Sequence, residues 1–420
     1  MKPDSQAKSV VIVGAGIVGI ACAHYLSKAG LHVTVIDRKN IAGACSHANC
    51  GYICPSHILP LTEPGAIRVA LKSLFNRRAP FRIKPRLSPS LWNWMWQFSR
   101  RCTHRRMLES AEHLKSILDS SIVEYRRIVA EERFACEWKD SGLLYVLQTA
   151  RGMEDFGKTD QILSDHFGVR ARHIPGTELP SFDPALKQGL AGAFYYADDA
   201  SLRPDLLASE WSSRLRDRGV TFVEDCELLT IGKSKGRITC LSTSTGEMPV
   251  DRVVFAAGAW SVQLSKQLGC AIPIEPGKGY SVTMTRPDPC PTYPMLFPEH
   301  KVGMTPFENG YRLGSMMEFA GFDATIPRHR IAQLRESARP YLVTPFTNET
   351  QQTWYGWRPM TWDSLPIIGA VPSCMNAYLA TGHNMLGLSL APATGKLIAE
   401  MLCETPTHID AAAFSPRRFQ

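Results

Sequence analysis

The order of apolar and polar positions predicts a strand, a helix and a second strand near the start of the chain. An unbroken apolar run at residues 10–13 is typical of a buried parallel strand. A helical pattern then extends to Lys28, and Gly30 is suited to end it. A second apolar run at residues 31–36 ends at Asp37. The pattern therefore predicts a β-α-β unit in a parallel sheet.

Similar patterns return late in the chain and extend this first domain. Pro204 suits the first turn of a helix, Gly219 suits its end, and a strand is expected from Val220. An apolar strand at residues 251–257 leads to Gly258. Residues 378–380 predict one more strand, followed by a glycine-rich turn and a helix to about Leu402.

The middle of the chain has a different pattern. Alternating runs such as "GYSVTM" and "YRLGSM" predict an antiparallel sheet. We therefore expect an α/β plus α+β fold, in which a discontinuous Rossmann-like domain carries a second, antiparallel-sheet domain for the substrate. The predicted division is 1–75, 197–261 and 355–420 for the nucleotide domain, and 76–196 and 262–354 for the substrate domain.

Three glycines after the first strand form a G-x-G-x-x-G motif. Gly14 permits a tight turn, Gly16 lets the backbone approach a pyrophosphate, and Gly19 lets the helix pack closely. The helix N-terminus then faces the phosphates. Asp37 stands where a carboxylate can accept ribose hydroxyls. The unit predicts dinucleotide binding, and Asp37 disfavours the extra phosphate of NADP, but the motif alone leaves NAD and FAD open.

Composition and charge narrow the class. The chain has 420 residues, 44% of them hydrophobic and 20% charged, with a formal net charge of +8. These are ordinary values for a soluble protein of two or more domains. Zinc-finger spacing and basic helices are absent from the sequence, so nucleic acid is not expected as a partner. The sequence shows neither a signal-peptide pattern nor an apolar run of roughly 18 residues. We therefore expect a protein with reduced cysteines that is cytoplasmic or peripheral on the cytoplasmic face of the inner membrane.

Several segments spread along the chain resemble one enzyme group. They are "VVIVGAGIVGIACAHYLSKAGLHVTVIDR", "ANCGYICPS", "WNWMWQFSRRC", "KGYSVTM", "GWRPMTWDSLPIIG" and "TGHNMLGLSLAPATGKLIAEML". Together they make the chain similar to the D-amino acid dehydrogenase group of FAD-dependent oxidoreductases, which is related to D-amino acid oxidase, glycine oxidase and sarcosine oxidase. The resemblance implies FAD, a two-domain fold and oxidation of an amino acid at its α-carbon.

The resemblance also implies a set of FAD contacts. The pyrophosphate, ribose, adenine and flavin would meet residues from six parts of the chain. These residues are Gly14, Ala15, Gly16, Ile17, Val18, Gly19, Asp37, Arg38, Ser46, Asn49, Gly51, Leu228, Gly258, Gly382, His383, Leu386, Gly387 and Leu388.

Four residues are candidates for the substrate site. Arg358 lies where the group places an arginine for the amino-acid carboxylate, and its planar fork suits two hydrogen bonds; the alternative is a structural ion pair. Tyr280 is expected to donate to the carboxylate or contact the amine, or else to pack on the sheet. His383 would contact flavin or substrate, or cap its turn, and Tyr52 is a weaker candidate of the same kind.

The expected reaction is hydride transfer from the α-carbon to flavin N5, which needs no strong protein base, with electrons passed to a quinone or another acceptor that is not oxygen. Two alternatives stay open within this chemistry: a D-proline or cis-4-hydroxy-D-proline dehydrogenase, in which Trp357 packs on the ring, and an amino-acid or N-methyl amine oxidase that uses oxygen. A flavin-free NAD-binding sensor is the rival of another class.

Two sequence features fit more than one interpretation. The tryptophan-rich segment at residues 92–102 is typical of an interfacial membrane contact or, as we favour, of a core helix with Trp92 and Trp96 one turn apart. "CSHANCGYICP" has C-x4-C-x3-C gaps, which match neither the plant-type ferredoxin nor zinc-knuckle spacing. We expect no metal there, and a loop under the flavin where Cys45 or His47 is a candidate for a covalent link.

Overall fold

The first predicted sheet is present, with five parallel strands and one antiparallel edge strand. The computed structural model describes residues 9–68, 79–84 and 86–420. In pairing order the strands are β19 (Ile367–Ala370), β20 (Ala377–Thr381), β13 (Arg252–Phe255), β1 (Ser9–Val13), β2 (His32–Ile36) and β9 (Thr221–Val223). Strands from the start, middle and end of the chain thus share one sheet, as the discontinuous pattern predicts.

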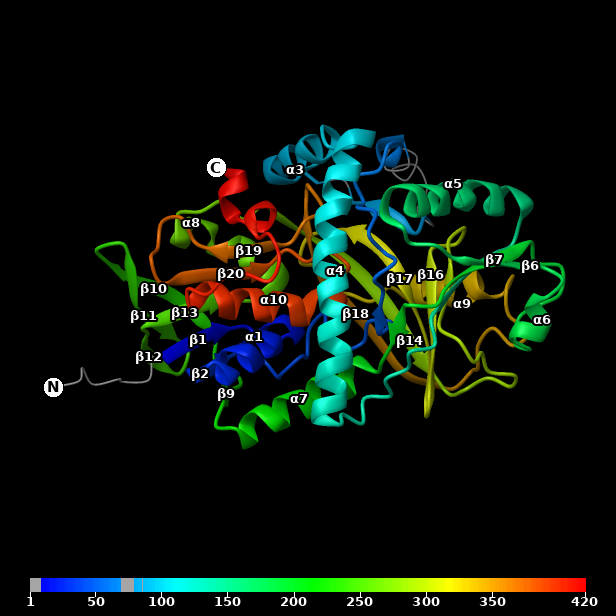
Figure 1. Cartoon of the computed structure of the whole chain (residues 1–420). Helices are drawn as coiled ribbons and strands as arrows, with labels where there is room; N and C mark the ends of the chain where they lie inside the picture. The colour runs from blue at the N-terminus through cyan, green and yellow to red at the C-terminus, as the bar shows by residue number, and fades with distance from the viewer. Residues whose placement is uncertain (1–8, 69–78, 85) are drawn as a thin grey trace.

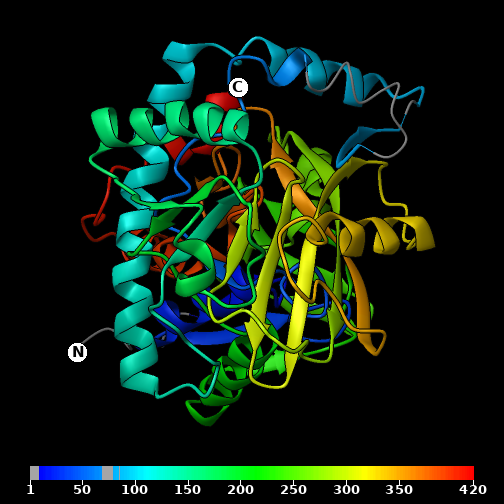
Figure 2. The ribbon, with the colours of Figure 1, turned by 90° about the vertical axis from the view of Figure 1, so that its right-hand side faces the viewer.

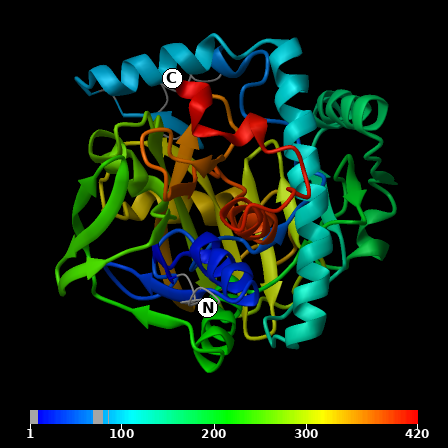
Figure 3. The same ribbon diagram turned by 60° about the vertical axis from the view of Figure 1, so that its left-hand side comes forward.

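Four helices pack with this sheet in one hydrophobic core: α1 (Ile17–Lys28), α4 (His104–Glu132), α7 (Pro204–Asp217) and α10 (Gly387–Leu402). α1 and α10 lie side by side, with the long α4 across them (Figures 1 and 3). Their close approach depends on Gly395, where a Cβ would lie 2.5 Å from the Ala21 backbone. The bounds of α1, α7 and α10 confirm the sequence prediction.

The second sheet covers the other half of the molecule (Figure 2). Most of its neighbouring strands are antiparallel, as predicted, but β5 pairs in parallel with β15 and β4 with β17. In pairing order the strands are β18 (Thr350–Thr361), β14 (Ile274–Met284), β17 (Gly310–Phe319), β16 (Val302–Phe307), β15 (Met295–Phe297), β5 (Leu143–Leu147), β7 (Gly192–Tyr196) and β6 (Arg172–Pro175), with β4 (Phe81–Ile83) beside β17.

Smaller elements complete the described chain. β3 (Tyr52–Ile53) pairs with β8 (Ala200–Ser201), and β10 (Leu228–Ser234), β11 (Arg237–Thr243) and β12 (Gly246–Pro249) form a separate antiparallel sheet. The other helices are α3 (Pro89–Ser99), α5 (Ala150–Phe167), α6 (Leu179–Phe182), α8 (Ser265–Leu268), α9 (Arg328–Ala338) and the short 3-10 turns η1 (Gly258–Leu264), η2 (Ala412–Phe414) and η3 (Pro416–Phe419).

The predicted domain boundaries stay a prediction; one strand crosses a boundary, and one helix packs on the other domain. β18 stays paired with β14 through Thr361, so the boundary at residues 354–355 falls inside a strand of the second sheet. α4, which we assign to the substrate domain, packs on α10, and its Tyr125 hydroxyl donates to the Leu388 carbonyl at 2.8 Å. The two predicted domains are therefore joined by the pairing of β18 with β14 and by the packing of α4 on α10.

The sequence favours a core position for the tryptophan-rich helix α3, but two of its three tryptophans are exposed. Trp94 is the buried tryptophan, and its indole N–H lies 3.2 Å from the Pro273 and Met360 carbonyls. Trp92 and Trp96 are 53% and 54% exposed, so the interpretation that these two pack in the core is wrong. The reason is the helix phase: residues two positions apart lie about 200° around the helix, on opposite sides. Within residues 9–68, 79–84 and 86–420, the helices are all too short or too polar to cross a bilayer.

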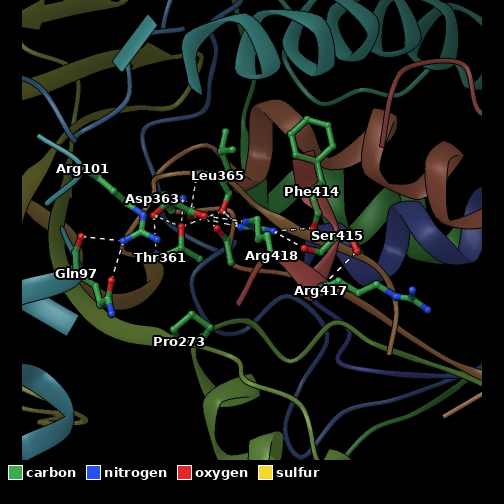
Figure 4. A network of polar contacts seen from close by, with 12 residues as sticks. Gln97, Arg101, Pro273, Thr361, Asp363, Leu365, Phe414, Ser415, Arg417 and Arg418 are labelled. Carbon is green, nitrogen blue, oxygen red and sulfur yellow. Dashed lines mark hydrogen bonds and ion pairs between the residues drawn. The ribbon is translucent and has the colours of Figure 1, made fainter. Parts of the chain in front are cut away.

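A polar network ties the end of β18 to the C-terminal turns (Figure 4). Arg418 donates to the Asp363 carboxylate at 2.7 Å and to the Leu365 carbonyl at 3.0 Å. On the other side of this turn, Arg101 donates to Gln97 and stacks over the Trp362 ring. The network fixes the turn that follows the strand carrying Arg358.

Candidate functional site

A single continuous cavity of about 1030 Å³ runs between the two sheets. One end is lined by the glycine turn after β1, the middle by residues 44–52 and the turn before α10, and the other end by the second sheet, α3 and residues 57–66. Its length and lining allow an extended dinucleotide at one end and a small substrate at the other.

The glycine turn fits a phosphate cradle. A Cβ at Gly14 would lie 2.5 Å from the Ala256 carbonyl, and one at Gly19 would lie 1.9 Å from the Gly14 carbonyl, so both positions require glycine for packing. A Cβ at Gly16 would meet only the Ser46 hydroxyl oxygen, at 3.5 Å, and Gly16 lines the cavity. Gly16 is therefore the glycine that leaves room for a phosphate at the start of α1.

Asp37 and Arg38 lie at the end of β2 and both line the cavity. The Asp37 carboxylate accepts from the backbone N–H of Ala15 at 2.8 Å and of Lys39 at 3.0 Å, while burial raises its pKa. It therefore braces the glycine turn in addition to the ribose contact that we predict. Arg38 stacks over the Trp260 ring at 3.9 Å and makes a flat polar surface beside the cavity.

The loop at residues 45–51 is held by its own polar side chains. The Ser46 hydroxyl accepts from the Ile17 N–H at 3.0 Å, and the Asn49 side chain accepts from the Gly51 N–H at 2.8 Å. Gly51 has a φ of +76°, and a Cβ there would lie 1.9 Å from the Leu202 carbonyl. The three residues line the cavity, so the loop lies where the flavin is predicted.

The sulfur atoms of this loop are thiols. Cys45 and Cys50 line the cavity, and burial raises the pKa of both. His47 lies outside the cavity lining, with its ring Nε2 3.0 Å from the Gln352 amide nitrogen. In the part of the chain that the structure describes, histidine, cysteine and carboxylate groups form no cluster that could hold a metal. Of the two candidates for a covalent link, only Cys45 faces the cavity.

The turn before α10 brings the backbone of Leu386, Gly387 and Leu388 to the cavity, together with Leu228 and Gly258 from the other side. α10 has no side-chain cap at its N-terminus, so its first N–H groups are open to a negatively charged ring edge. His383 lines the cavity, but its Nε2 lies 3.0 Å from the Thr394 hydroxyl inside α10, and burial lowers its pKa to about 3. His383 is therefore a neutral brace for the turn.

Three of the predicted cofactor residues are absent from the cavity lining. Ala15 and Gly19 lie outside the cavity lining, as does Gly382, which has a φ of +71° and packs against Thr361 and Ile367. Direct contact of these three residues with the cofactor stays a prediction. The same is true of the cofactor and substrate contacts predicted for the other site residues.

Arg358 lies at the centre of the substrate end. Its guanidinium donates to the Met316 carbonyl and lies flat against Gly279, where an added Cβ would be 2.5 Å from the guanidinium carbon. Burial lowers its pKa, and the titratable groups nearest to it are the Cys45 and Cys50 thiols. Among the described residues it has no ion pair with a carboxylate, unlike the structural pair we gave as the alternative.

Glycines on the second sheet make this approach possible. Gly303, Gly314 and Gly356 line the cavity, and Gly279 lies against Arg358. Cβ atoms added at these four glycines would meet Tyr52, Cys50, Trp354 and Arg358, respectively, at 2.3–2.7 Å. Sequence reasoning missed this face. Isolated glycines inside strand patterns indicate a close approach and were the available signal.

Two predicted tyrosines have their hydroxyls occupied elsewhere. The Tyr280 hydroxyl donates to the Glu318 carboxylate at 2.7 Å, although Tyr280 is among the residues that line the cavity, and its contact with substrate stays a prediction. Side chains alternate along β14, so Gly279 faces the Arg358 guanidinium while the Tyr280 hydroxyl reaches Glu318. The Tyr52 hydroxyl lies 2.8 Å and 2.9 Å from the Met295 and Met304 carbonyls, which ties the flavin loop to the sheet.

Trp357 packs among protein rings. Trp260, Phe322 and Tyr355 surround it with ring centroids 5.0–5.4 Å away, and its indole N–H is buried without a hydrogen-bond partner. It lines the cavity beside Arg38 and Trp260, so its ring lies toward the nucleotide end.

Comparisons with known proteins agree with this arrangement. The sequence profile of the DAO family, described as FAD dependent oxidoreductase, matches residues 9–401. The chain is 32% identical over 401 residues to a D-amino acid dehydrogenase of Methylobacterium nodulans, covering 94% of both chains. It is 31% identical to one of Neisseria gonorrhoeae, covering 98% of this chain and 99% of that one. The glycine oxidase structure from Geobacillus kaustophilus matches with a TM-score of 0.78 at 21% identity over 97% of each chain, which shows the fold.

Proposed function

Because the chain belongs to the DAO family of FAD-dependent oxidoreductases, we propose that it oxidises a D-amino acid at its α-carbon and passes the electrons to an acceptor other than oxygen. The names of its relatives at about 30% identity support this substrate class. The observation that carries the proposal is Arg358, a half-buried arginine without a carboxylate partner among the described residues, at the end of the cofactor cavity.

Arg358 is suited to a substrate carboxylate. A buried guanidinium is costly unless it is paired with an anion. Its neighbours Cys45 and Cys50 are neutral, because burial raises the pKa of both thiols. Gly279 leaves the guanidinium flat, so its edge can bind a carboxylate with two parallel hydrogen bonds.

The rest of the site positions the substrate and excludes water. FAD, when bound, supplies the acceptor for the hydride that leaves the substrate α-carbon. The residues that would hold it are the Gly16 turn, Asp37, residues 45–51 and the N-terminus of α10. The product imine is released and hydrolysed by water to an oxo acid and ammonia. Since hydride loss requires a neutral amine and a fixed α-carbon, the work of the chain is positioning in a dry site.

Arg358→Ala tests the proposal. The variant should retain FAD, measured by its visible absorbance, while the KM for D-alanine in a dye-reduction assay rises at least tenfold. Arg339→Ala, an exposed arginine directly after α9, is the control and should behave as wild type. An unchanged KM in Arg358→Ala would contradict the carboxylate role, and wild-type preference for L-alanine would contradict the D-amino acid assignment. Stoichiometric peroxide release would favour an oxidase.

We also propose that α3 contacts a membrane surface where a quinone acceptor is available. Trp92 and Trp96 project from this helix, the Arg100 guanidinium lies 4.7 Å from the Trp96 ring centre, and Arg105 is exposed nearby in the chain. Exposed indoles with adjacent cations suit the headgroup region of anionic bilayers.

Co-sedimentation with anionic phospholipid vesicles tests this contact. Wild type should sediment with vesicles at low salt and be released at high salt, and Trp92→Ala/Trp96→Ala should stay in the supernatant. Met375→Ala, an exposed apolar side chain in the other domain, is the matched control. Equal sedimentation of the double variant and wild type would refute a role for α3.

A further inference from the structure

A row of residues crosses the cavity face of the second sheet and ends at a tyrosine. Trp354 pairs with Ser281, Ser281 with Gly314, Gly314 with Gly303, Gly303 with Leu296, and Leu296 with Tyr145. Residues directly opposite one another in a sheet point to the same face. All six line the cavity, so Tyr145 faces the same chamber as the substrate end of the sheet.

His57 faces Tyr145 at this end of the chamber. Its Nδ1 lies 3.5 Å from the Tyr145 hydroxyl, and both side chains line the cavity. Burial lowers the pKa of His57, so the ring is neutral and offers one donor and one acceptor. Nothing in the hydride route uses either group, because that route needs no protein base at the α-carbon.

The pair is held rigidly. The Tyr145 ring packs against Phe156 at 5.0 Å and edge-on against Tyr196 at 5.3 Å. The turn before His57 is fixed by Ser56, whose N–H and hydroxyl donate to the buried Asp199 carboxylate at 3.0 Å and 2.6 Å. Rigid polar groups can hold a ligand atom without much loss of side-chain entropy.

The walls between Arg358 and this pair are mainly apolar. Leu296, Met316, Met317 and Phe98 are among the side chains that line this part of the cavity. In an apolar pocket, a small number of placed polar groups determines orientation and specificity. A substrate whose carboxylate is bound at Arg358 can therefore direct its side chain along these walls to the polar pair, while Glu63 and Lys301 are charged residues elsewhere in the lining.

We propose that His57 and Tyr145 form a subsite for a hydrogen-bonding group on the substrate side chain. The preferred substrates are then D-amino acids with a hydroxyl or amide group in the side chain, in place of wholly aliphatic ones. The inference rests on the proposed function, because Arg358 orients the substrate toward the pair. It adds two specificity-determining residues to the site.

Matched substrate pairs test the subsite. D-threonine and D-valine have nearly the same shape, as do D-asparagine and D-leucine. Wild type should show the higher kcat/KM for the polar member of each pair. Tyr145→Phe and His57→Leu should each reduce this polar-to-apolar ratio roughly tenfold or more, the effect of one hydrogen bond, and leave kcat/KM for D-valine within about threefold.

Tyr196→Phe is the control for loss of a nearby phenol. Its ring contacts Tyr145, but its hydroxyl donates to Asp160 at 2.9 Å and lies outside the cavity lining. This variant should keep the wild-type ratio. An unchanged ratio in Tyr145→Phe and His57→Leu, or an equal loss for both members of each pair, would overturn the subsite.

A binding measurement separates this inference from the proposed function. The carboxylates 3-hydroxybutyrate and 3-methylbutyrate differ in a hydroxyl against a methyl group, and their Kd can be measured from the flavin absorbance without turnover. The hydroxylated ligand should bind more tightly to wild type, and Tyr145→Phe should abolish the difference. If wild type oxidises no D-amino acid yet shows this difference, the proposed function fails and the subsite stands; equal Kd values in wild type sink the subsite alone.

Discussion

Replacement of Gly279 by alanine isolates the geometry that places Arg358. The added Cβ would lie 2.5 Å from the guanidinium carbon and 2.5–2.6 Å from its two terminal nitrogens. Ordinary van der Waals contact begins at 3.4 Å, so the guanidinium must move by 3.4 − 2.5 = 0.9 Å. The charge is retained, and only its position changes.

A shift of this size has a calculable consequence. Misplacement of a binding group by about 1 Å can reduce catalysis by about 100-fold, which corresponds to about 2.7 kcal/mol of transition-state stabilisation. We therefore expect Gly279→Ala to reduce kcat/KM for a D-amino acid by about 10- to 100-fold. FAD content should stay at the wild-type level, because Gly279 lies outside the cavity lining.

The assay is dye reduction over a range of substrate concentrations, with melting temperature and flavin absorbance as measures of folding. Gly310→Ala, in β17 of the same sheet, is the control, because its added Cβ would lie no closer than 3.2 Å to any neighbour, the nearest atom being the end of the Gln351 side chain. If Gly279→Ala folds, retains FAD and keeps the wild-type kcat/KM, the guanidinium does not anchor the substrate and the reasoning is refuted.

Three further predictions concern the cofactor and the fold. Gly14→Ala, at a φ of +113°, should lower the free energy of unfolding by about 1–3 kcal/mol. Gly16→Ala should instead keep the melting temperature of the apoprotein and raise the Kd for FAD at least tenfold. Equal stability of the two variant apoproteins would contradict this prediction. Burial lowers the pKa of His24 to about 4 from its ordinary 6.5, so acidification from pH 6.5 to 4 protonates the unfolded chain first and lowers stability. His24→Gln should show a smaller drop in melting temperature over that range than wild type, and an equal drop would exclude His24 as a cause. Arg418→Ala should lower the free energy of unfolding by about 3 kcal/mol, because it leaves the Asp363 carboxylate largely buried without its partner, and calorimetry with Arg417→Ala as the control checks it.

The sequence pattern was sufficient where one local signal determines the structure. Gly14, Gly16 and the apolar runs around them predict the β1-α1-β2 unit, and the turn at Gly387 predicts the start of α10. Each of these elements is defined by residues close together in the chain, so its bounds and its place at the cavity follow from pattern alone.

The rest depends on strand register and helix phase. Tyr280 and Gly279 are neighbours in sequence, yet only the second faces Arg358, and the pairing of β14 with β18 decides which. Tyr145 faces His57 only because β5 pairs with β15 in parallel. Trp92 is exposed and Trp94 is buried because they lie on opposite sides of α3. The clustering of tryptophans in the sequence does not indicate which side of the helix faces the core.

The interleaved strand order has a consequence for biosynthesis. β1 pairs with β13 and β13 with β20, and the cavity is lined by both Gly14 and Leu388. These two residues are more than three hundred positions apart, so Leu388 is synthesised long after Gly14. Arg418, which donates a hydrogen bond to Asp363, is synthesised after both. The cofactor site therefore has no stable precursor in the growing chain, and FAD is expected to enter after translation of nearly all of the described sequence.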